Sequence, residues 1–296
     1  MRVLVIDSHN MIHRARFGFG DGAHKIYFNF FRMLMGEMKT HQPDIVYIVD
    51  EGSPVQSLAV MKEYKANRQR LDDPQFHREK AEIFDTVQNL SGLVYIRHPE
   101  FECDDVIGHI ATELHPKDDV VIVSTDSDFI QLISDRVRLW HPKKKKFLDP
   151  WHVDYITWKS LKGDPTDNVP GVVGVGPKRA DVLCKSEDLL KEFLGSDPER
   201  RRQFETARTV IQLKNVTSKG LQISQADLCV DGLYEEFSHR SFRSIIGKAW
   251  PKWCAQFEKS GEKTWKLNKC STTTSSNFCE SVDSSLSTST HTLPVI

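Results

Sequence analysis

The segment RVLVID at residues 2–7 is the clearest signal of the fold, because a short apolar run there ends in an acid. Two further runs have the same form, DIVYIVD at 44–50 and DVVIVSTD at 119–126. A fourth run, LVYIRH at 93–98, is similar but ends without an acid. Runs of this length, rich in Val and Ile, are typical of strands buried on both faces of a parallel sheet.

Helix-like stretches lie between these runs, at 25–40, 76–90 and 104–115. Strands that alternate with helices predict an α/β fold with right-handed crossovers. The run VRLWHP at 137–142, followed by four lysines and FLDP, predicts a β-hairpin or a basic edge element. Lys143 to Lys146 would form either a solvated hairpin tip or a contact with a duplex backbone.

The character of the chain changes near residue 151. We therefore expect an α/β core over 1–150 and a mostly helical subdomain over 151–265, which begins with a helix over 151–162. Fourteen of the twenty-two residues from Ser271 to Thr292 are Ser or Thr. Such a segment buries too little apolar area to offset its ordering entropy, so a disordered tail is expected over 266–296.

Composition narrows the class of protein. The 296 residues carry 40 basic and 41 acidic side chains, so the net charge gives no sign of a nucleic-acid partner. The six cysteines form no C-x-x-C pair, which argues against a zinc finger and against thioredoxin-like chemistry. No apolar run reaches the roughly 18 residues that span a bilayer. We expect a cytoplasmic protein with reduced thiols and no membrane association.

Carboxylates gather where the predicted strands end. In an open parallel sheet, ligands bind outside the carboxyl ends of the strands. The acids expected along this edge, with two more from the helical subdomain, are Asp7, Asp50, Glu102, Asp104, Asp105, Asp126, Asp128, Asp164 and Asp167. Carboxylates so placed repel one another unless cations neutralise them, and oxygen ligands suit hard ions such as magnesium or manganese.

Each of these acids has a plainer interpretation. An Asp at a strand end or helix start is often a cap or a turn residue, and Asp104 with Asp105 could serve as the charge at a helix N-terminus. The plainer interpretation does not explain why an acid recurs at the ends of several predicted strands along one sheet edge. The pattern favours a site for two divalent ions, which could activate a water and stabilise the leaving oxygen in phosphodiester hydrolysis.

Six motifs in order resemble those of the structure-specific 5′ nucleases, the family that includes phage 5′-3′ exonucleases, the 5′-nuclease domains of bacterial DNA polymerase I and flap endonucleases. They are VIDSHNMIHRARF at 5–17, IVDEG at 48–52, EYKANR at 63–68, ECDDVIG at 102–108, STDSDFIQL at 124–132 and KGDPTDNVPGVVGVGPKRA at 162–180. The resemblance covers about residues 1–195. It implies a PIN-like parallel-sheet core followed by a helix–three-turn–helix DNA-binding motif at about 160–195.

The resemblance also assigns roles to residues. It implies one metal on Asp7, Asp50, Glu102, Asp104 and Asp126, and a second on Asp105, Asp128, Asp164 and Asp167. Arg14 and Lys65 match positions that hold the scissile phosphate, where cations stabilise developing charge. Tyr64 is expected to pack in the core rather than to stack on a base.

Two DNA-binding segments are expected from the same resemblance. Residues 58–80 match the arch over the active site, with Arg68 and Arg70 beside a single-stranded 5′ end. The turn with Gly171, Gly174 and Gly176 precedes a helix that carries Lys178 and Arg179. Its backbone N–H groups would bind a DNA phosphate, and a potassium ion in this turn is plausible by the same resemblance. The aromatic group at Trp250, Trp253, Phe257 and Trp265 is expected to pack the subdomain, with docking of a replication protein as the alternative.

The function expected is a metal-dependent 5′-3′ exonuclease and flap endonuclease that acts on flapped, nicked or branched duplex DNA in replication or repair, with RNA-containing 5′ ends as a further substrate. A PIN-type ribonuclease acting on single-stranded RNA is the first alternative. A non-catalytic protein that binds branched DNA is the second, and the presence of all nine acids argues against it.

Overall fold

A computed structural model describes residues 1–68 and 73–261 of the protein. Its centre is a seven-stranded sheet with the order β6-β5-β4-β1-β2-β3-β9. The strands are β1 Arg2–Asp7, β2 Ile45–Val49, β3 Val94–Arg97, β4 Asp119–Val123, β5 Val137–His141, β6 Lys146–Phe147 and β9 Gln222–Ser224. The five inner strands run parallel and the two outer ones are antiparallel to their neighbours. The expected α/β core with a parallel sheet is confirmed.

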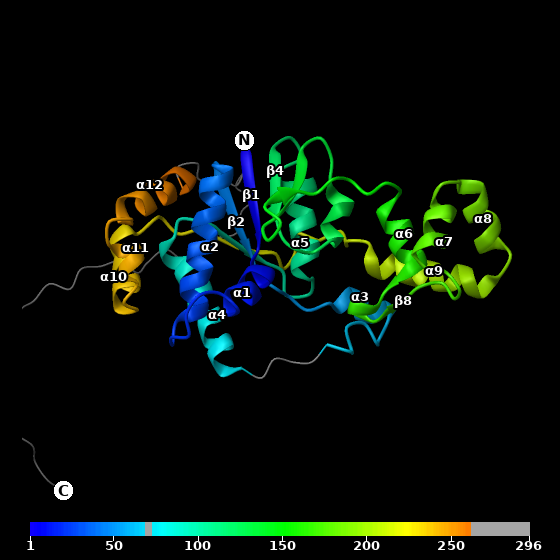
Figure 1. Ribbon diagram of the computed structural model, residues 1–296, viewed down its shortest axis with the longest axis horizontal. Helices are drawn as coiled ribbons and strands as arrows, with labels where there is room; N and C mark the ends of the chain where they lie inside the picture. Colours follow the sequence, from blue (N-terminus) through cyan, green and yellow to red (C-terminus); the bar gives the residue numbers. More distant parts are fainter. Residues whose placement is uncertain (69–72, 262–296) are drawn as a thin grey trace, which may run out of the picture. The chain divides into compact units, whose positions relative to one another are not determined.

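Helices cover both faces of the sheet (Figure 1). The described helices are α1 Ser8–Arg16, α2 Lys25–His41, α3 Val55–Val60, α4 Pro74–Leu90, α5 Cys103–His109, α6 Tyr155–Lys162, α7 Pro177–Cys184, α8 Glu187–Gly195, α9 Pro198–Ile211, α10 Val230–His239, α11 Arg243–Ile246 and α12 Trp250–Gly261. A π-helical turn at Ile110–Leu114 extends α5, so the helix predicted over 104–115 is present in two forms. Short 3₁₀ turns lie at Asp128–Leu132 and Pro165–Asp167.

The buried strands alternate their side chains between two layers. Leu4 and Ile6 of β1 belong to a large apolar cluster with residues of α2 and α4, whereas α5 packs across β1, β2 and β3 from the other face. Figure 1 shows α2 and α4 on one side of β1 and β2, with α5 on the other. A nearly all-apolar strand therefore suits its place, because both of its faces lie under helices.

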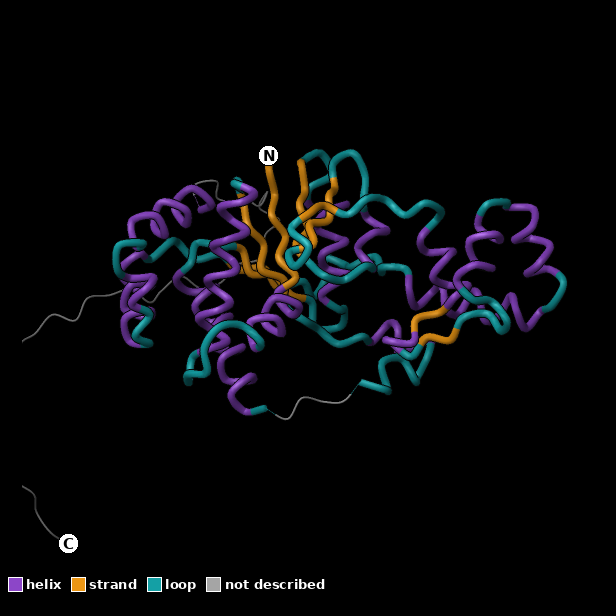
Figure 2. Tube along the Cα trace, viewed as in Figure 1, coloured by secondary structure: helices purple, strands orange, loops and turns teal. Residues whose placement is uncertain are grey.

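The helices α6 to α9 form a small cluster of their own. Its core contains Leu161, Val172, Val175, Ala180, Leu183, Leu194 and Phe204. A two-residue ladder between β7 Gly163–Asp164 and β8 Val169–Pro170 closes the loop that carries two of the predicted metal ligands. Figure 2 shows the two short strands of this ladder among the purple helices. The helix expected over 151–162 begins later, at Tyr155, where Asp154 caps it by accepting the Thr157 N–H at 2.6 Å.

The segment after residue 211 packs differently from the expectation of one helical subdomain over 151–265. Strand β9 joins the nuclease sheet beside β3, with Ile223 opposite Ile96. Helices α10 to α12 add Phe237, Trp253 and Phe257 to the cluster formed with α2 and α4. Short apolar runs carry no information about which distant surface they cover, and this explains why the return of the chain to the sheet was not predicted.

The same packing bears on one expectation for the last part of the chain, the role of its aromatic side chains. Trp253 and Phe257 are buried and Trp250 packs against the same cluster, so these three side chains pack in a core, but in the one formed with α2 and α4 and not in the core of helices α6 to α9. Trp265 and the tail expected over 266–296 lie outside the described residues, as does Arg70. Among the residues that the structure describes, no helix has the length and apolar character needed to cross a bilayer.

Candidate active site

Three strands and one helix start deliver acids to the same edge of the sheet. Asp7 is the last residue of β1, and Asp50 and Asp126 follow β2 and β4, which flank β1 in parallel register. Glu102 directly precedes α5, which begins after β3. Because the carboxyl ends of parallel strands meet at one edge, the topology places these acids at the same edge of the sheet.

Asp7 is buried at this edge and has two local roles. Its carboxylate caps α1 by accepting the Asn10 N–H at 2.9 Å, and it accepts the Ser124 hydroxyl at 2.6 Å. Burial nevertheless raises its pKa from 3.8 to about 6, with a further contribution from the nearby Asp126. The capping role and the site role are therefore compatible, and the hydrogen bonds do not remove the cost of holding a negative charge here.

Asp104 carries the same signature more strongly. Burial of its carboxyl, and then the charges of Asp126, Asp7 and Glu51, raise its pKa well above the ordinary value. Acids that raise one another's pKa lack enough local positive charge in the protein alone. A divalent cation among Asp7, Asp104 and Asp126 would supply the missing charge, and their hard oxygen donors suit such an ion.

Asp50 was expected to be a metal ligand, whereas the structure gives its carboxylate other partners and points to the adjacent Glu51. The Asp50 carboxylate accepts the Tyr95 hydroxyl at 2.9 Å and pairs with Lys80 at 3.3 Å and with Arg97 at 3.7 Å. The next residue, Glu51, is the one whose pKa rises to about 7, first through burial and then through the charges of Glu102 and Asp7. Glu51 was missed because strand alternation stops at residue 49, after which spacing no longer tells which of two adjacent acids faces the site.

Asp105 is buried and tied into the backbone. One carboxylate oxygen accepts the Glu102 N–H at 3.3 Å, and the other accepts the Lys214 N–H at 2.7 Å. Burial still raises the pKa of Asp105 to about 6. Asp105 therefore does cap the N-terminus of α5, as the plainer interpretation has it. Any role in holding an ion through a water would be additional to this cap. The bond to Lys214 also joins α5 to the segment that follows α9.

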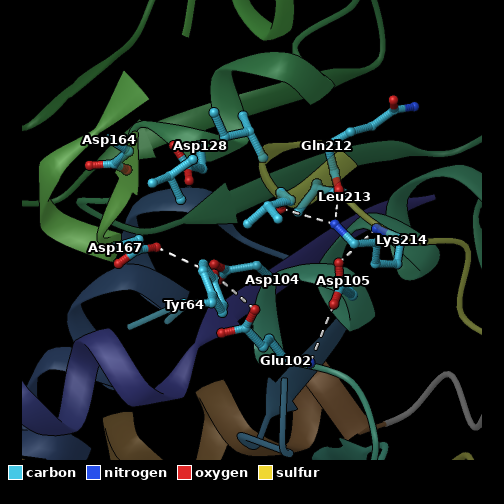
Figure 3. A pocket seen from close by; sticks show the side chains of 13 residues that line it. Tyr64, Glu102, Asp104, Asp105, Asp128, Asp164, Asp167, Gln212, Leu213 and Lys214 are labelled. Atoms are coloured by element: carbon cyan, nitrogen blue, oxygen red, sulfur yellow. Dashed lines mark hydrogen bonds between the residues drawn. The ribbon is translucent and has the colours of Figure 1, made fainter. Parts of the chain in front are cut away.

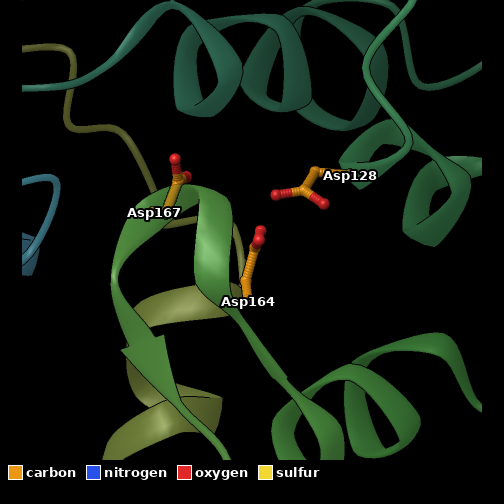
Figure 4. A group of neighbouring side chains, drawn as sticks. All are labelled: Asp128, Asp164 and Asp167. Carbon is orange, nitrogen blue, oxygen red and sulfur yellow. The ribbon is translucent and has the colours of Figure 1, made fainter. Parts of the chain in front are cut away.

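A second group of acids combines the core with the helical part. Asp128, Asp164 and Asp167 each offer a carboxylate oxygen, and these oxygens lie within 4.8 Å of one another. Figure 4 shows Asp164 and Asp167 at either end of the short 3₁₀ turn, with Asp128 facing them from the core. Asp164 and Asp167 are three residues apart in GDPTDN, so a single tight turn presents both acids to Asp128.

Cations already lie among these acids. The ammonium of Lys159 pairs with Asp128 and lies 2.7 Å from an oxygen of Asp164. Lys65 pairs with Glu102 and lies 3.8 Å from Asp167, while Arg68 pairs with the other oxygen of Asp167. Lys159 was missed in the sequence, because a lysine in the middle of a predicted helix carries no signal until the fold shows which acids it meets.

Lys65 is held in an unusual backbone conformation beside this site. Its φ of 57° is in the left-handed region, and its N–H donates to the Asp167 carbonyl at 2.9 Å. The neighbouring Tyr64 ring is buried with Met61 and Val169, as expected, while its hydroxyl donates to Glu102 at 3.0 Å. Figure 3 shows this hydroxyl between Glu102 and Asp167 in the pocket that both acids line. Lys65 thus has a strained backbone and contacts both Glu102 of the core and Asp167 of the helical part, as is typical of a functional position.

Arg14 lies on α1, half-buried, among the acids Glu37 and Asp7, which partly offset the lowering of its pKa by burial. It extends from the same helix that Asp7 caps. The structure therefore brings Arg14 near one end of the acid group, whereas Lys65 lies among Glu102 and Asp167 at the other end.

The glycine turn favours glycine at two positions, at one because of close packing and at the other because of a positive φ. A Cβ on Gly171 would lie 2.4 Å from the Lys162 carbonyl carbon, and Gly174 has a φ of 76°. Gly176 forms the N-cap of α7, which has no side-chain cap. Lys178 and Arg179 follow in the exposed first turn of α7, and Arg179 donates to the Gly174 carbonyl at 3.3 Å. These residues form an exposed helix N-terminus flanked by positive charge.

Comparison with known proteins assigns the chain to a family. A family model described as "5'-3' exonuclease, N-terminal resolvase-like domain" matches residues 2–156. The 5'-3' exonuclease of Aquifex aeolicus (strain VF5) is 28% identical over 251 residues, with 76% of this chain and 85% of that protein covered. A thermostable DNA polymerase I of Thermus thermophilus is 28% identical over 238 residues, which are 74% of this chain and 28% of the polymerase. The chain thus spans less than a third of that polymerase.

A solved structure supports the same assignment for the fold. The T5 D15 protein, co-crystallised with metal ions, superposes with a TM-score of 0.57 at 20% identity over 71% of this chain and 90% of that chain. The α/β core with its attached helical part is therefore the 5′-nuclease fold. Its sheet-edge acids, and the match over residues 2–156, lead to one conclusion: the chain belongs to the 5′-3′ exonuclease family.

Proposed function

We propose that this protein is a divalent-metal-dependent nuclease that removes 5′ ends and 5′ flaps from duplex DNA. The observation that carries the proposal is the meeting of Asp128 from the core with Asp164 and Asp167 from the helical part, with oxygens within 4.8 Å. Asp128 and the turn with Asp164 and Asp167 are about forty residues apart in the sequence, and the fold brings them together beside the acids at the sheet edge.

The acids fall into two groups that suit two ions. Asp7, Asp104, Asp126 and Glu51 form one group. Burial and the charges of neighbouring acids raise the pKa values of Asp104 and Glu51, which places these acids together. Asp128, Asp164 and Asp167 form the other. Mg²⁺ or Mn²⁺ fits these oxygen donors, and two such ions would supply water activation and stabilisation of the leaving oxygen. Asp50 and Asp105 would then lie beside the ions without binding them directly. Asp50 pairs with Lys80, and Asp105 accepts the backbone N–H of Lys214.

Lys65 and Arg14 are the cations proposed to hold the scissile phosphate. Lys65 lies beside Glu102 and Asp167, so its ammonium is already where the phosphate oxygens would approach the acids. A positive group fixed near the reacting phosphate stabilises charge that grows in the transition state. Arg68, which pairs with Asp167, would extend this positive surface toward the 5′ strand.

The glycine turn and α7 are proposed to hold the duplex. The exposed N-terminus of α7 and the side chains of Lys178 and Arg179 offer backbone N–H groups and positive charge to a phosphate. A potassium ion in the same turn is part of the proposal. DNA is thus the expected partner, together with RNA-containing 5′ ends, in the cytoplasm of a bacterium or of a phage-infected host.

The test uses a duplex with a 5′-labelled flap, Mg²⁺ and three proteins: the wild type, Asp126→Asn and Asp135→Asn. Asp135 is exposed on the loop before β5 and serves as a control for the same chemical change. We expect cleavage by the wild type and by Asp135→Asn, and a loss of at least about 100-fold in Asp126→Asn with flap binding retained. Structure-selective binding without cleavage by the wild type would support a non-catalytic binder, and cleavage of single-stranded RNA alone would support a ribonuclease.

A further inference from the structure

Lys159 lies where a cation is needed between two carboxylates of different segments. It belongs to α6, and its ammonium pairs with Asp128 and lies 2.7 Å from an oxygen of Asp164. Its side chain is 7% exposed. Tyr155, one turn earlier on α6, donates its hydroxyl to the same Asp128 oxygen at 3.1 Å. Helix α6 thus directs a charge and a hydroxyl at one acid.

The contacts of Lys159 are those of a group that replaces an ion. Buried ammonium groups are stabilised by carboxylates that surround them, and an isolated one would lose its proton or destabilise the fold. Lys159 meets two of the three acids in the second group, while Arg68 pairs with the third, Asp167. In the protein alone, two side-chain cations therefore offset part of the charge of these three acids.

A divalent ion would bind the same two carboxylates that Lys159 contacts. Mg²⁺ binds oxygen ligands at about 2.0–2.1 Å with near-octahedral geometry. The ammonium contacts one oxygen of Asp128 and one oxygen of Asp164, so an ion that binds these two oxygens must displace it. An ammonium that stays adjacent would repel the ion in surroundings with a low effective dielectric.

We propose that Lys159 is an internal competitor for the divalent ion at Asp128, Asp164 and Asp167, and that it lowers the affinity of this site until the ion displaces it. This inference rests on the proposed function, because it requires that these acids bind an ion. Lys159 is a positioning residue in this view: its ammonium holds the two halves of the site together without an ion and leaves the acids when the ion enters.

The test measures Mn²⁺ binding to the full chain without DNA, by calorimetry and by the electron paramagnetic resonance of free Mn²⁺. Lys159→Met removes the charge and keeps a similar length. Lys162→Met is the matched control, since Lys162 is on the same helix but its ammonium lies over the Trp158 ring at 5.1 Å. We expect the weaker of two Mn²⁺ ions to bind at least about tenfold more tightly in Lys159→Met, because a unit charge a few ångströms from a divalent ion is costly in partly buried surroundings.

We expect Lys162→Met to bind as the wild type does, and Lys159→Arg to bind no more tightly than the wild type. Unchanged or weaker Mn²⁺ binding in a folded Lys159→Met would overturn the inference and leave Lys159 as a structural anchor. The proposed function fails in a different way, namely if the wild type binds no Mn²⁺ at all.

Lys159→Met leaves two half-buried acids without their cation and could fail to fold without metal. The wild type then provides the measurement. A buried, ion-paired ammonium exchanges its protons slowly, so its ¹⁵N resonance can be followed and assigned by its absence in Lys159→Arg. We expect this resonance to shift as diamagnetic Mg²⁺ fills the second site. A resonance that is unchanged at saturating Mg²⁺ would overturn the inference.

Discussion

Replacing Asp7 with Asn is expected to stabilise the metal-free protein at pH 8 while it abolishes nuclease activity. Burial raises the pKa of Asp7 from 3.8 to about 6. Each unit corresponds to about 1.4 kcal/mol, so the ionised carboxylate destabilises the folded chain by up to about 3 kcal/mol relative to the unfolded chain. Asn at this position can still accept the Asn10 N–H and donate to the Ser124 oxygen, without the charge.

The pH dependence has a defined sign. Because the pKa of Asp7 is higher in the folded chain, the folded state holds an extra proton between about pH 4 and pH 6. The destabilising charge is absent below about pH 4, grows as the pH rises and is complete above about pH 6. Asp7→Asn should therefore gain about 1–3 kcal/mol at pH 8 and show little difference from the wild type at pH 4.

Urea unfolding in EDTA, followed by circular dichroism at both pH values, measures this gain. Asp135→Asn, an exposed change of the same kind, should leave the unfolding midpoint unchanged. Saturating Mg²⁺ should reverse the order at pH 8, since the wild type gains the free energy of ion binding and the variant loses a ligand. An Asp7→Asn protein that is less stable than the wild type at pH 8 in EDTA would refute the reasoning, and so would an equal gain at both pH values.

Three further outcomes follow from other parts of the molecule. Mn²⁺ affinity of the wild type should fall as the pH drops from 8 to 5.5, because protons then compete for Asp7 and Glu51, whose pKa values are about 6 and about 7. An affinity that does not depend on pH in a calorimetric titration would contradict this. Gly174→Ala should lose about 1–2 kcal/mol of stability and weaken duplex binding, because its φ of 76° disfavours a Cβ, whereas Gly176→Ala, whose Cβ meets no atom, should keep the wild-type melting temperature. Trp253→Ala should cost about 3–5 kcal/mol in urea unfolding, because the ring packs in the core formed with α2; a loss near zero would show that α12 does not contribute to that core.

Much of the site could be predicted because its acids follow strands. The runs that end in Asp7 and Asp50 and the run before Asp126 were visible as apolar segments, and parallel strands bring their carboxyl ends to one edge whatever the details of packing. The turn GDPTDN likewise presents Asp164 and Asp167 together, because the two acids are three residues apart in one tight turn. Local sequence is sufficient wherever secondary structure alone determines the direction of a side chain.

Other features depended on contacts between distant segments. The sequence offered no reason to prefer Glu51 over Asp50, and only the pairing of Asp50 with Lys80 and Arg97 separates their roles. The packing of α10 to α12 on the nuclease sheet could not be predicted either, since an amphipathic helix shows that it has a partner but does not identify it.

The sequence by itself determined the α/β class, the sheet edge that carries the acids and the identity of most of those acids, because hydrophobic periodicity and strand ends are local properties. Only the tertiary structure decided which cations face them. Lys65 and Lys159 come from segments almost a hundred residues apart, and each reaches an acid of a distant segment, Lys65 at Glu102 and Lys159 at Asp128. Charge balance at a buried site is a property of the folded neighbourhood, since burial and distance set the strength of every interaction there.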